Sequence, residues 1–411
     1  MNSKFRKYKL GELCRVKHGY PFQGEFFSDN GEYIILTPGN FYEEGGFKRI
    51  AGKEKFYLGT FLDEYMCKKG DLIVAMTQQA EGLLGSTAIV PEDNTYLHNQ
   101  RIGLVFPNEE LVDKLYLYYL FMTKSVREQL RNSSSGTKVK HTSPEKIYDV
   151  DVYIPPIKEQ RKIGQLLYNI EQKIQNNNQI INTLQKQMTL IYDYWFTQFD
   201  FPDRNGKPYR TSGGKLIWNE ELQREIPYGW DCITLSNLLR KNTKAFDYNT
   251  VQPTIDLSVM PSESIALNQL NSSDAFGTNL FEMKEGDILF GSIRPYLKKA
   301  GIAPCNGVVT GTIHSYYPIK DSDYNFTLMT ISRDVFFDYA VRMSTGTKMP
   351  VISSDNLLAY KIPYSEEVVR QFNKINIRHI VCKNIQENQN LTELKRWLLP
   401  MFMNGQVEVL D

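Results

Sequence analysis

The sequence has few of the features that mark secreted or membrane-bound proteins. Its 411 residues include only five cysteines, which are scattered, odd in number and never spaced as CxxC. Such cysteines predict a reduced, cytoplasmic protein without a disulfide framework. The amino-terminal segment MNSKFRKYKL lacks the apolar stretch of a signal peptide, and no run of 18 apolar residues could form a transmembrane helix. We therefore expect no membrane partner.

Neither sign of charge is in excess. Lysine and arginine number 48 against 47 aspartate and glutamate, which gives a net charge of +1. This balance excludes a histone-like polybasic protein, but it allows DNA binding through local basic patches. The 41% hydrophobic content argues against a disordered chain, and the length predicts two to three domains.

Catalytic motifs are missing as well. The sequence contains no GxGxxG, GxxxxGK[ST], HExxH or GxSxG pattern, which are signatures of nucleotide binding, metalloproteases and serine hydrolases. Its five histidines share no metal-ligand spacing with the cysteines. We predict a non-enzyme with no catalytic residue and no metal site.

An internal repeat is present. The segment Ser135–Lys138 (SGTK) recurs as Thr345–Lys348 (TGTK), an offset of 210 positions. The segment Lys69–Val74 (KGDLIV) recurs as Glu285–Phe290 (EGDILF), an offset of 216 positions. Because a period near 200 residues is far longer than that of solenoid repeats, it indicates two similar domains within one chain.

Each half combines a mixed part with a long helix. Short apolar runs such as 33–36 and 288–290, separated by glycine, asparagine and proline, predict buried strands, while 112–130 has a helical apolar pattern. The fold class is therefore α+β. We expect globular domains over 1–157 and 200–364, with long helices over 158–199 and 365–411.

The long helices have heptad patterns. In the first helix the seam positions recur in alternate steps of four and three over four heptads, which is typical of a coiled coil. They are Ile163, Leu167, Ile170, Ile174, Asn177, Ile181, Leu184 and Met188. Adding the repeat offset predicts the second seam, with Ile377, Ile380, Asn384, Leu391, Leu394 and Leu398.

Each of these two apolar seams must pack against another part of the protein to be buried. We predict that the two helices pack on each other as an antiparallel coiled coil related by a pseudo-twofold axis, with Asn177 and Asn384 fixing register. The alternative is that each helix packs on its own globular domain.

Polar, basic and aromatic clusters occur at matching places in the repeat and are candidates for DNA contact. Arginine recognises guanine edges, glutamine recognises adenine, and lysine contacts phosphate. In the first half the candidates are Lys17, Tyr20, Gln23, Gln78, Gln79, Arg101, Lys138, Lys140 and His141. In the second half they are Ser292, Arg294, Tyr296, Lys298, Lys299 and Lys348. Each could also be an ordinary solvated loop residue.

This arrangement resembles the specificity (S) subunit of type I restriction–modification systems. The segment 154–163 (IPPIKEQRKI) is similar to the family's Pro-Pro-x-x-Glu-Gln start of the central helix, and 226–230 (IPYGW) is similar to the opening of its second recognition domain. Segments 170–174 (IEQKI) and 194–196 (YWF) are also family-like. The second copy has EEVVRQ over 366–371 in place of a clear Pro-Pro-x-x-Glu-Gln segment.

The resemblance implies a non-catalytic DNA reader in a prokaryotic cytoplasm. Each target-recognition domain would read one half of a bipartite double-stranded site, and the helices would set the spacer. Two modification subunits, which bind S-adenosylmethionine and methylate adenine, and ATP-using restriction subunits would be its partners, with Mg also expected in those subunits. The chain itself would carry no cofactor. The rivals are a DNA-independent coiled-coil adaptor and a stand-alone nuclease or methyltransferase.

Overall fold

The structure, a computed structural model, describes residues 4–50, 52–78, 82–136, 139–247, 250–277 and 279–409. The chain forms two compact units. The first comprises Met1–Gln172 with Glu393–Asp411, and the second comprises Lys173–Thr392. The long helices α5 (Ile157–Tyr192) and α10 (Ile377–Met403) therefore each contribute to both units.

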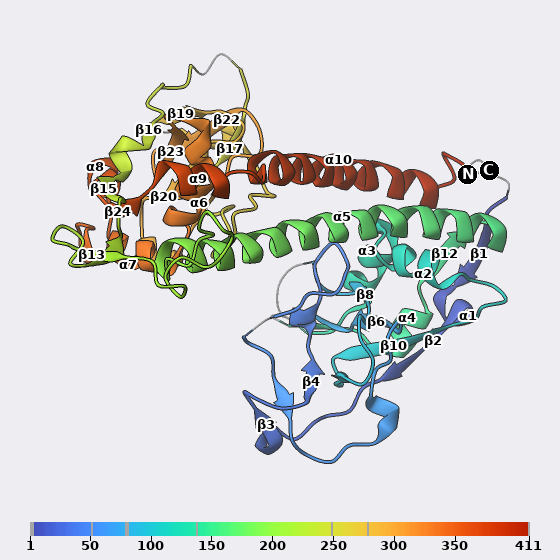
Figure 1. The fold of residues 1–411 in the computed structure, drawn as a ribbon. Coiled ribbons are helices and arrows are strands. Elements are labelled where there is room, and N and C mark those ends of the chain that lie inside the picture. The colour runs from blue at the N-terminus through green and yellow to red at the C-terminus, as the bar shows by residue number, and fades with distance from the viewer. Residues whose placement is uncertain are drawn as a thin grey trace. The chain divides into compact units, whose positions relative to one another are not determined.

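The first unit combines short strands with short helices (Figure 1). Its strands are β1 (Arg6–Lys9), β2 (Cys14–His18), β3 (Phe27–Ser28), β4 (Tyr33–Leu36), β5 (Phe56–Tyr57), β6 (Leu72–Ala75), β7 (Thr77–Gln78), β8 (Thr87–Ile89), β9 (Tyr96–His98), β10 (Ile102–Pro107), β11 (Lys140–His141) and β12 (Asp151–Ile154). Its shorter helices are α1 (Leu10–Leu13), α2 (Lys114–Phe121), α3 (Lys124–Ser133) and α4 (Pro144–Tyr148), of which α2 and α3 lie beside α5.

Two four-stranded sheets organise this unit. One has the order β2-β10-β6-β8 and is antiparallel throughout, and the other has the order β3-β5-β4-β9 with a parallel β4–β9 pair. β6 is buried along its whole length, as the apolar run LIVA after the Gly-Asp turn predicts. The main core joins these strands to the buried tyrosines of α2 and to Ile163, Leu167, Phe402 and Met403 of the long helices.

The second unit repeats this plan. Its strands are β13 (Leu216–Asn219), β14 (Arg224–Pro227), β15 (Asp231–Thr234), β16 (Leu239–Lys241), β17 (Pro253–Ile255), β18 (Asn271–Ser272), β19 (Leu280–Met283), β20 (Ile288–Gly291), β21 (Ala300–Ile302), β22 (Gly307–Thr310), β23 (Ile313–Pro318) and β24 (Lys361–Tyr364). Its shorter helices are α6 (Tyr324–Ile331), α7 (Asp334–Arg342), α8 (Ser354–Leu358) and α9 (Glu366–Phe372).

The sheet orders of the two units correspond. The sheet β16-β23-β20-β21 matches β2-β10-β6-β8, and β18-β17-β22-β19 again contains one parallel pair, β17–β22. The pair β15–β24 matches β1–β12, because in each unit the last strand pairs with a strand near the start of that unit. The predicted α+β class and internal repeat are therefore confirmed.

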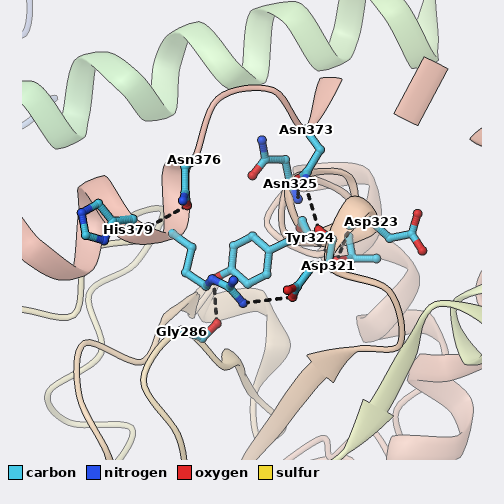
Figure 2. Close-up of polar contacts among 10 residues, drawn as sticks. Gly286, Asp321, Asp323, Tyr324, Asn325, Asn373, Asn376 and His379 are labelled. Atoms are coloured by element: carbon cyan, nitrogen blue, oxygen red, sulfur yellow. Dashed lines mark hydrogen bonds and ion pairs between the residues drawn. The ribbon is translucent and has the colours of Figure 1, made fainter. Parts of the chain in front are cut away.

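The second long helix is interrupted, in contrast to α5. Helix α9 ends at Phe372 and α10 begins at Ile377, whereas the sequence predicts one helix over 365–411. The Asn325 side-chain amide donates to the carbonyl oxygens of Phe372 (3.2 Å) and Ile375 (2.7 Å), which would otherwise accept helical hydrogen bonds. Asn376 then caps the new helix, because its Oδ1 accepts from the backbone N–H of His379 at 3.1 Å (Figure 2).

A second interruption lies in the helical stretch expected over 112–130. The structure divides it into α2, which ends at Phe121, and α3, which begins at Lys124. The hydroxyl of Thr123 accepts from the backbone N–H of Val126, so this threonine acts as the amino-terminal cap of α3.

Candidate nucleic-acid interface

In the first unit, the strand that follows the Gly-Asp strand pairs with the Gly-Thr-Lys turn. β7 and β11 are antiparallel, with Gln78 opposite Lys140 and Thr77 opposite His141. The Thr77 Oγ1 lies 3.0 Å from His141 Nδ1. Residues about 60 positions apart in the sequence therefore form one short polar ribbon.

The second unit makes the same connection. Ile293 forms a β-bridge with Val351, and the Arg294 backbone N–H donates to the Pro350 carbonyl at 2.7 Å. Ile352 N–H donates to the Ser292 carbonyl at 3.0 Å, just as Thr142 N–H donates to Met76 in the first unit. Both units thus bring together two motifs that the sequence places far apart.

The turn itself requires glycine in both units. Gly136 has a φ of +98° and Gly346 a φ of +95°, which side chains other than glycine rarely adopt. A Cβ at Gly136 would also lie 2.0 Å from the Val139 carbonyl oxygen. The repeated Gly-Thr-Lys motif is therefore explained first by turn geometry.

A third part of the first unit, which contains Tyr20 and Arg101, lies next to the β7–β11 ribbon. Tyr20 forms a parallel bridge with Asn99, and Gln100 N–H donates to the Tyr20 carbonyl at 3.2 Å. Met76 N–H donates to the Arg101 carbonyl at 2.9 Å, which sets the exposed Arg101 side chain beside the start of the β7–β11 ribbon. We name this first-unit set, Tyr20, Gln78, Arg101, Lys140 and His141, the first face.

Backbone strain marks the corresponding loop of the second unit. Arg294 (φ 51°) and Lys298 (φ 53°) both adopt the left-handed conformation, on either side of the short 3₁₀ helix η7 (Pro295–Leu297). Left-handed non-glycine residues carry a conformational cost and concentrate at functional sites. We name Arg294, Tyr296 and Lys348 the second face, and all three side chains are exposed.

Four candidates make contacts within the protein that compete with a DNA-contacting role, which stays a prediction for each of them. Ser292 is buried and its hydroxyl donates to the Thr312 carbonyl at 2.8 Å. Lys298 pairs with Asp334 (2.7 Å) and Glu263 (3.0 Å). Lys17 pairs with Glu64 at 2.8 Å, and the Lys299 ammonium donates to the Leu257 carbonyl. Each of these four side chains therefore already has a hydrogen-bond or ion-pair partner within the protein.

The remaining candidates divide by exposure. Gln23 is exposed, and Tyr20, Gln78 and Lys140 are half-buried. Gln78 uses its side-chain oxygen to accept from Leu84 N–H at 3.2 Å. Gln79 and Lys138 lie outside the described residues.

Each unit also contains a buried histidine, His98 in the first and His314 in the second. His314 on β23 is 8% exposed, and its Nε2 lies 3.2 Å from the Ile352 carbonyl oxygen. Burial, with a smaller contribution from Lys241, lowers the pKa of His314 to about 4. Burial also lowers the pKa of His98, which lies near the first face. Both imidazoles are therefore neutral near pH 7, and the sequence alone did not assign them this structural part.

The long helices form a second feature of interest, and within each unit their segments lie side by side (Figure 1). The first helix buries six of its predicted positions and half-buries Ile174 and Leu184. The buried six are Ile163, Leu167, Ile170, Asn177, Ile181 and Met188. Asn177 contacts Asn388 in the second unit, and Glu171 contacts Lys395 in the first, so the two helices touch in each unit.

The second helix follows a different stripe from the one predicted. Its buried positions include Ile377, Val381, Ile385 and Asn388, whereas Leu394 is 42% exposed. Ile380, Asn384, Leu391 and Leu398 are half-buried, and the Asn384 amide donates back to the Ile380 carbonyl at 2.7 Å. The observed stripe therefore agrees with the predicted one at Ile377 and departs from it by one residue at Val381, Ile385 and Asn388.

Polar groups interrupt the helix pairing in both units. In the second unit, Glu387 accepts from Asn177 at 2.8 Å and pairs with Lys173 at 3.2 Å, and these contacts lower the pKa of its carboxyl group. In the first unit, Glu171 accepts from the hydroxyls of Tyr118 (2.9 Å) and Tyr119 (3.1 Å).

Metal and membrane features are missing from the part of the chain described. Within the described ranges, no group of three or more histidine, cysteine, aspartate or glutamate side chains could hold a metal ion. Among the same residues, no helix combines the length and apolar character needed to cross a bilayer. The described cysteines are all free thiols.

Comparisons with known proteins point to one family. The sequence model described as "Type I restriction modification DNA specificity domain" matches residues 2–186. The MjaIX specificity subunit of a type I restriction enzyme from Methanocaldococcus jannaschii is 29% identical over 147 residues, which cover 36% of this chain and 32% of that protein. The HindI specificity subunit from Haemophilus influenzae is 21% identical over 476 residues, which cover 98% of this chain and all of that protein. The chain thus spans about a third of the first relative and the full length of the second.

A solved structure shares the fold. The crystal structure of the type I restriction–modification S subunit from M. genitalium aligns with a TM-score of 0.59 and 14% identity. The alignment covers all of this chain and 98% of that one. At this identity the likeness concerns the fold alone.

Proposed function

The chain belongs to the family of type I restriction–modification specificity subunits, and from this premise we propose that it recognises a bipartite sequence in double-stranded DNA. Its place in such a system is that of a non-catalytic subunit. Each unit reads one half of the site, the first through the first face and the second through the second face.

One observation carries the proposal. Two separate units bring the same pair of motifs together, the loop after the Gly-Asp strand and the Gly-Thr-Lys turn, with the same backbone contacts. Around this shared scaffold the exposed side chains differ, with Arg101 and His141 in one unit and Arg294 and Tyr296 in the other. A constant scaffold with variable side chains is what a reader of two different half-sites requires.

The paired helices fit the other parts of the proposal. We assign to α5 and α10 the setting of the spacer between half-sites, and to their exposed surfaces the docking of two modification subunits. The restriction subunits join that complex. S-adenosylmethionine, ATP and Mg act in the partner subunits, and this chain holds none of them.

The test uses the chain assembled with its modification subunit. Methylation mapping in cells that carry both should return one bipartite motif, and the purified complex should retain the matching duplex with a strong salt dependence. Arg204→Ala, which removes an exposed cation that belongs to neither face, is the matched control and should leave retention unchanged. Assembly with the modification subunit but no DNA dependence would support the adaptor reading instead. Methylation or cleavage by the isolated chain would contradict the non-catalytic assignment.

A further inference from the structure

The two Gly-Thr-Lys turns close in the same way but carry different side chains. In the first unit Ser135 and His141 exchange backbone hydrogen bonds of 3.0 and 2.9 Å, and in the second unit Thr345 and Val351 exchange bonds of the same lengths. The residues that end the turn are Val-Lys-His over 139–141 and Met-Pro-Val over 349–351. Two of the matched positions therefore differ in chemistry, with Lys140 in place of Pro350 and His141 in place of Val351, whereas Val139 and Met349 are both apolar.

The apolar groups of the second unit are left in contact with solvent. Met349 and Tyr296 are each 52% exposed, and Leu297 and Val351 are each 37% exposed. Arg294 joins the two segments, because its backbone N–H donates to the carbonyl of Pro350 between Met349 and Val351. The four apolar side chains thus surround one strained, arginine-bearing loop, and we name them the apolar rim.

Cations flank the apolar rim and argue for its occupant. Arg294 and Lys348 are both exposed, and Lys348 directly precedes Met349. Apolar side chains set among exposed cations match the major groove, where thymine presents a C5-methyl group between the phosphate backbones.

We infer that the apolar rim makes the second unit a reader of thymine C5-methyl groups, while the first unit, which has Lys140 and His141 where the second has Pro350 and Val351, reads its half-site through hydrogen bonds. This inference rests on the proposed function and deepens it, because it names the chemical group that each unit distinguishes. Met349 and Leu297 are specificity-determining residues in this reading, and Arg294 orients them by pairing with an adjacent guanine.

The experiment removes the methyl groups from the DNA and leaves the protein intact. The assembled complex is titrated with its mapped duplex, in which thymines of one half-site at a time are replaced by deoxyuridine. Replacement in the half-site of the second unit, identified as the half whose preference changes in Arg294→Ala, should weaken binding by about threefold to fivefold for each buried methyl group. Replacement in the other half should leave affinity unchanged.

Protein variants link the effect to the apolar rim. Met349→Ser combined with Leu297→Ser should abolish the deoxyuridine effect, and Met349→Leu should retain it, because leucine keeps an apolar group there. Three outcomes would overturn the inference. Deoxyuridine could lower the affinity equally in both half-sites, it could lower it in neither, or the loss of affinity could persist in the double serine variant. Release of the modification subunit by the double serine variant, with the deoxyuridine effect intact, would assign the rim to a protein partner. If the complex did not bind the mapped duplex even with all its thymines in place, the proposed function itself would be refuted.

Discussion

The side-chain amide of Asn177 on α5 donates a hydrogen bond of 2.9 Å to Asn388 on α10, at a point where Asn177 is 1% and Asn388 is 5% exposed. Asn388 in turn donates to Asn178 at 2.9 Å. A buried asparagine pair inside an otherwise apolar helix contact lowers stability but selects one register, because any shift leaves amide groups without partners.

Replacing one member of this pair should therefore cost stability. Asn177→Leu leaves the Asn388 oxygen without its donor, and we expect a loss of about 1–3 kcal/mol in unfolding free energy. The double variant with Asn388→Leu should recover that loss or exceed the parent, because well-packed apolar groups often replace buried polar pairs without penalty. Urea denaturation of the parent, both single variants and the double variant measures the coupling. Additive losses in the double variant would contradict a direct interaction.

The second face should act on one half-site only. Arg294→Ala should relax recognition at one position of one half-site, with a cost of about 1–3 kcal/mol, and leave the other half unchanged. Arg101→Ala is the matched variant in the first unit and should affect the opposite half. Methylation mapping with each variant checks both outcomes, and equal weakening of both halves would show that Arg294 does not read a base.

Two lysines of the second unit should contribute differently to the salt dependence of DNA binding. Lys348 is exposed in the Gly-Thr-Lys turn, whereas Lys298 is held by Asp334 and Glu263. Lys348→Ala should lower the slope of log affinity against log salt by about one, as expected for loss of one phosphate contact. Lys298→Ala should leave that slope unchanged. Titrations over a range of salt concentrations separate them, and a slope change in Lys298→Ala would restore it as a phosphate contact.

Acid should destabilise the second unit through His314. Its pKa is lowered from an ordinary value of 6.5 to about 4, so between these pH values the unfolded chain binds a proton that the folded chain does not. Stability is therefore complete above pH 6.5 and falls as pH decreases toward 4, by about 3 kcal/mol from this residue. His314→Asn should flatten the pH dependence of unfolding measured over that range. An unchanged slope would mean that other groups cause the acid loss.

The helix pair should act as a spacer ruler. Seven residues inserted after Asn178 in α5, together with seven inserted before Glu387 in α10, preserve the helical phase and lengthen both helices by about 10 Å. At about 3.4 Å per base pair, the mapped spacer should grow by about three base pairs. The insertion in α5 alone is the control, and it should weaken assembly because it mismatches the seam. A paired insertion that left the spacer unchanged would contradict the ruler.

Local patterns in the sequence were sufficient for much of the fold. The Gly-Asp-apolar runs became β6 and β20, and the heptad positions from Ile163 to Met188 became a buried stripe. These features depend on residues close together in the chain. For the same reason the two Gly-Thr-Lys turns could be recognised as equivalent before their surroundings were known.

Features set by distant residues could not be predicted. The break before α10 depends on Asn325, which belongs to α6. Within 365–411 the capping residue Asn376 is the one local sign that a new helix begins there. The residues next to Lys298 in the sequence do not distinguish it from a lysine that binds phosphate. Its ion pairs with Glu263 and Asp334 become visible only in the folded structure. Candidate site residues were therefore found as clusters, while the choice among them required tertiary structure.

The first unit is built from two stretches that are synthesised at different times. Phe402 and Met403 complete the same core as Leu10, Val16 and Tyr116. At about 5–20 residues per second, translation of the intervening segment 173–392 takes on the order of 10–45 seconds, so the amino-terminal stretch waits that long for its last core residues. The second unit, which is continuous in the chain, can close first. The nascent amino-terminal stretch is consequently the part of this protein most in need of chaperone protection. A stop codon before Phe402 would remove core residues from the first unit and leave the core of the second unit complete.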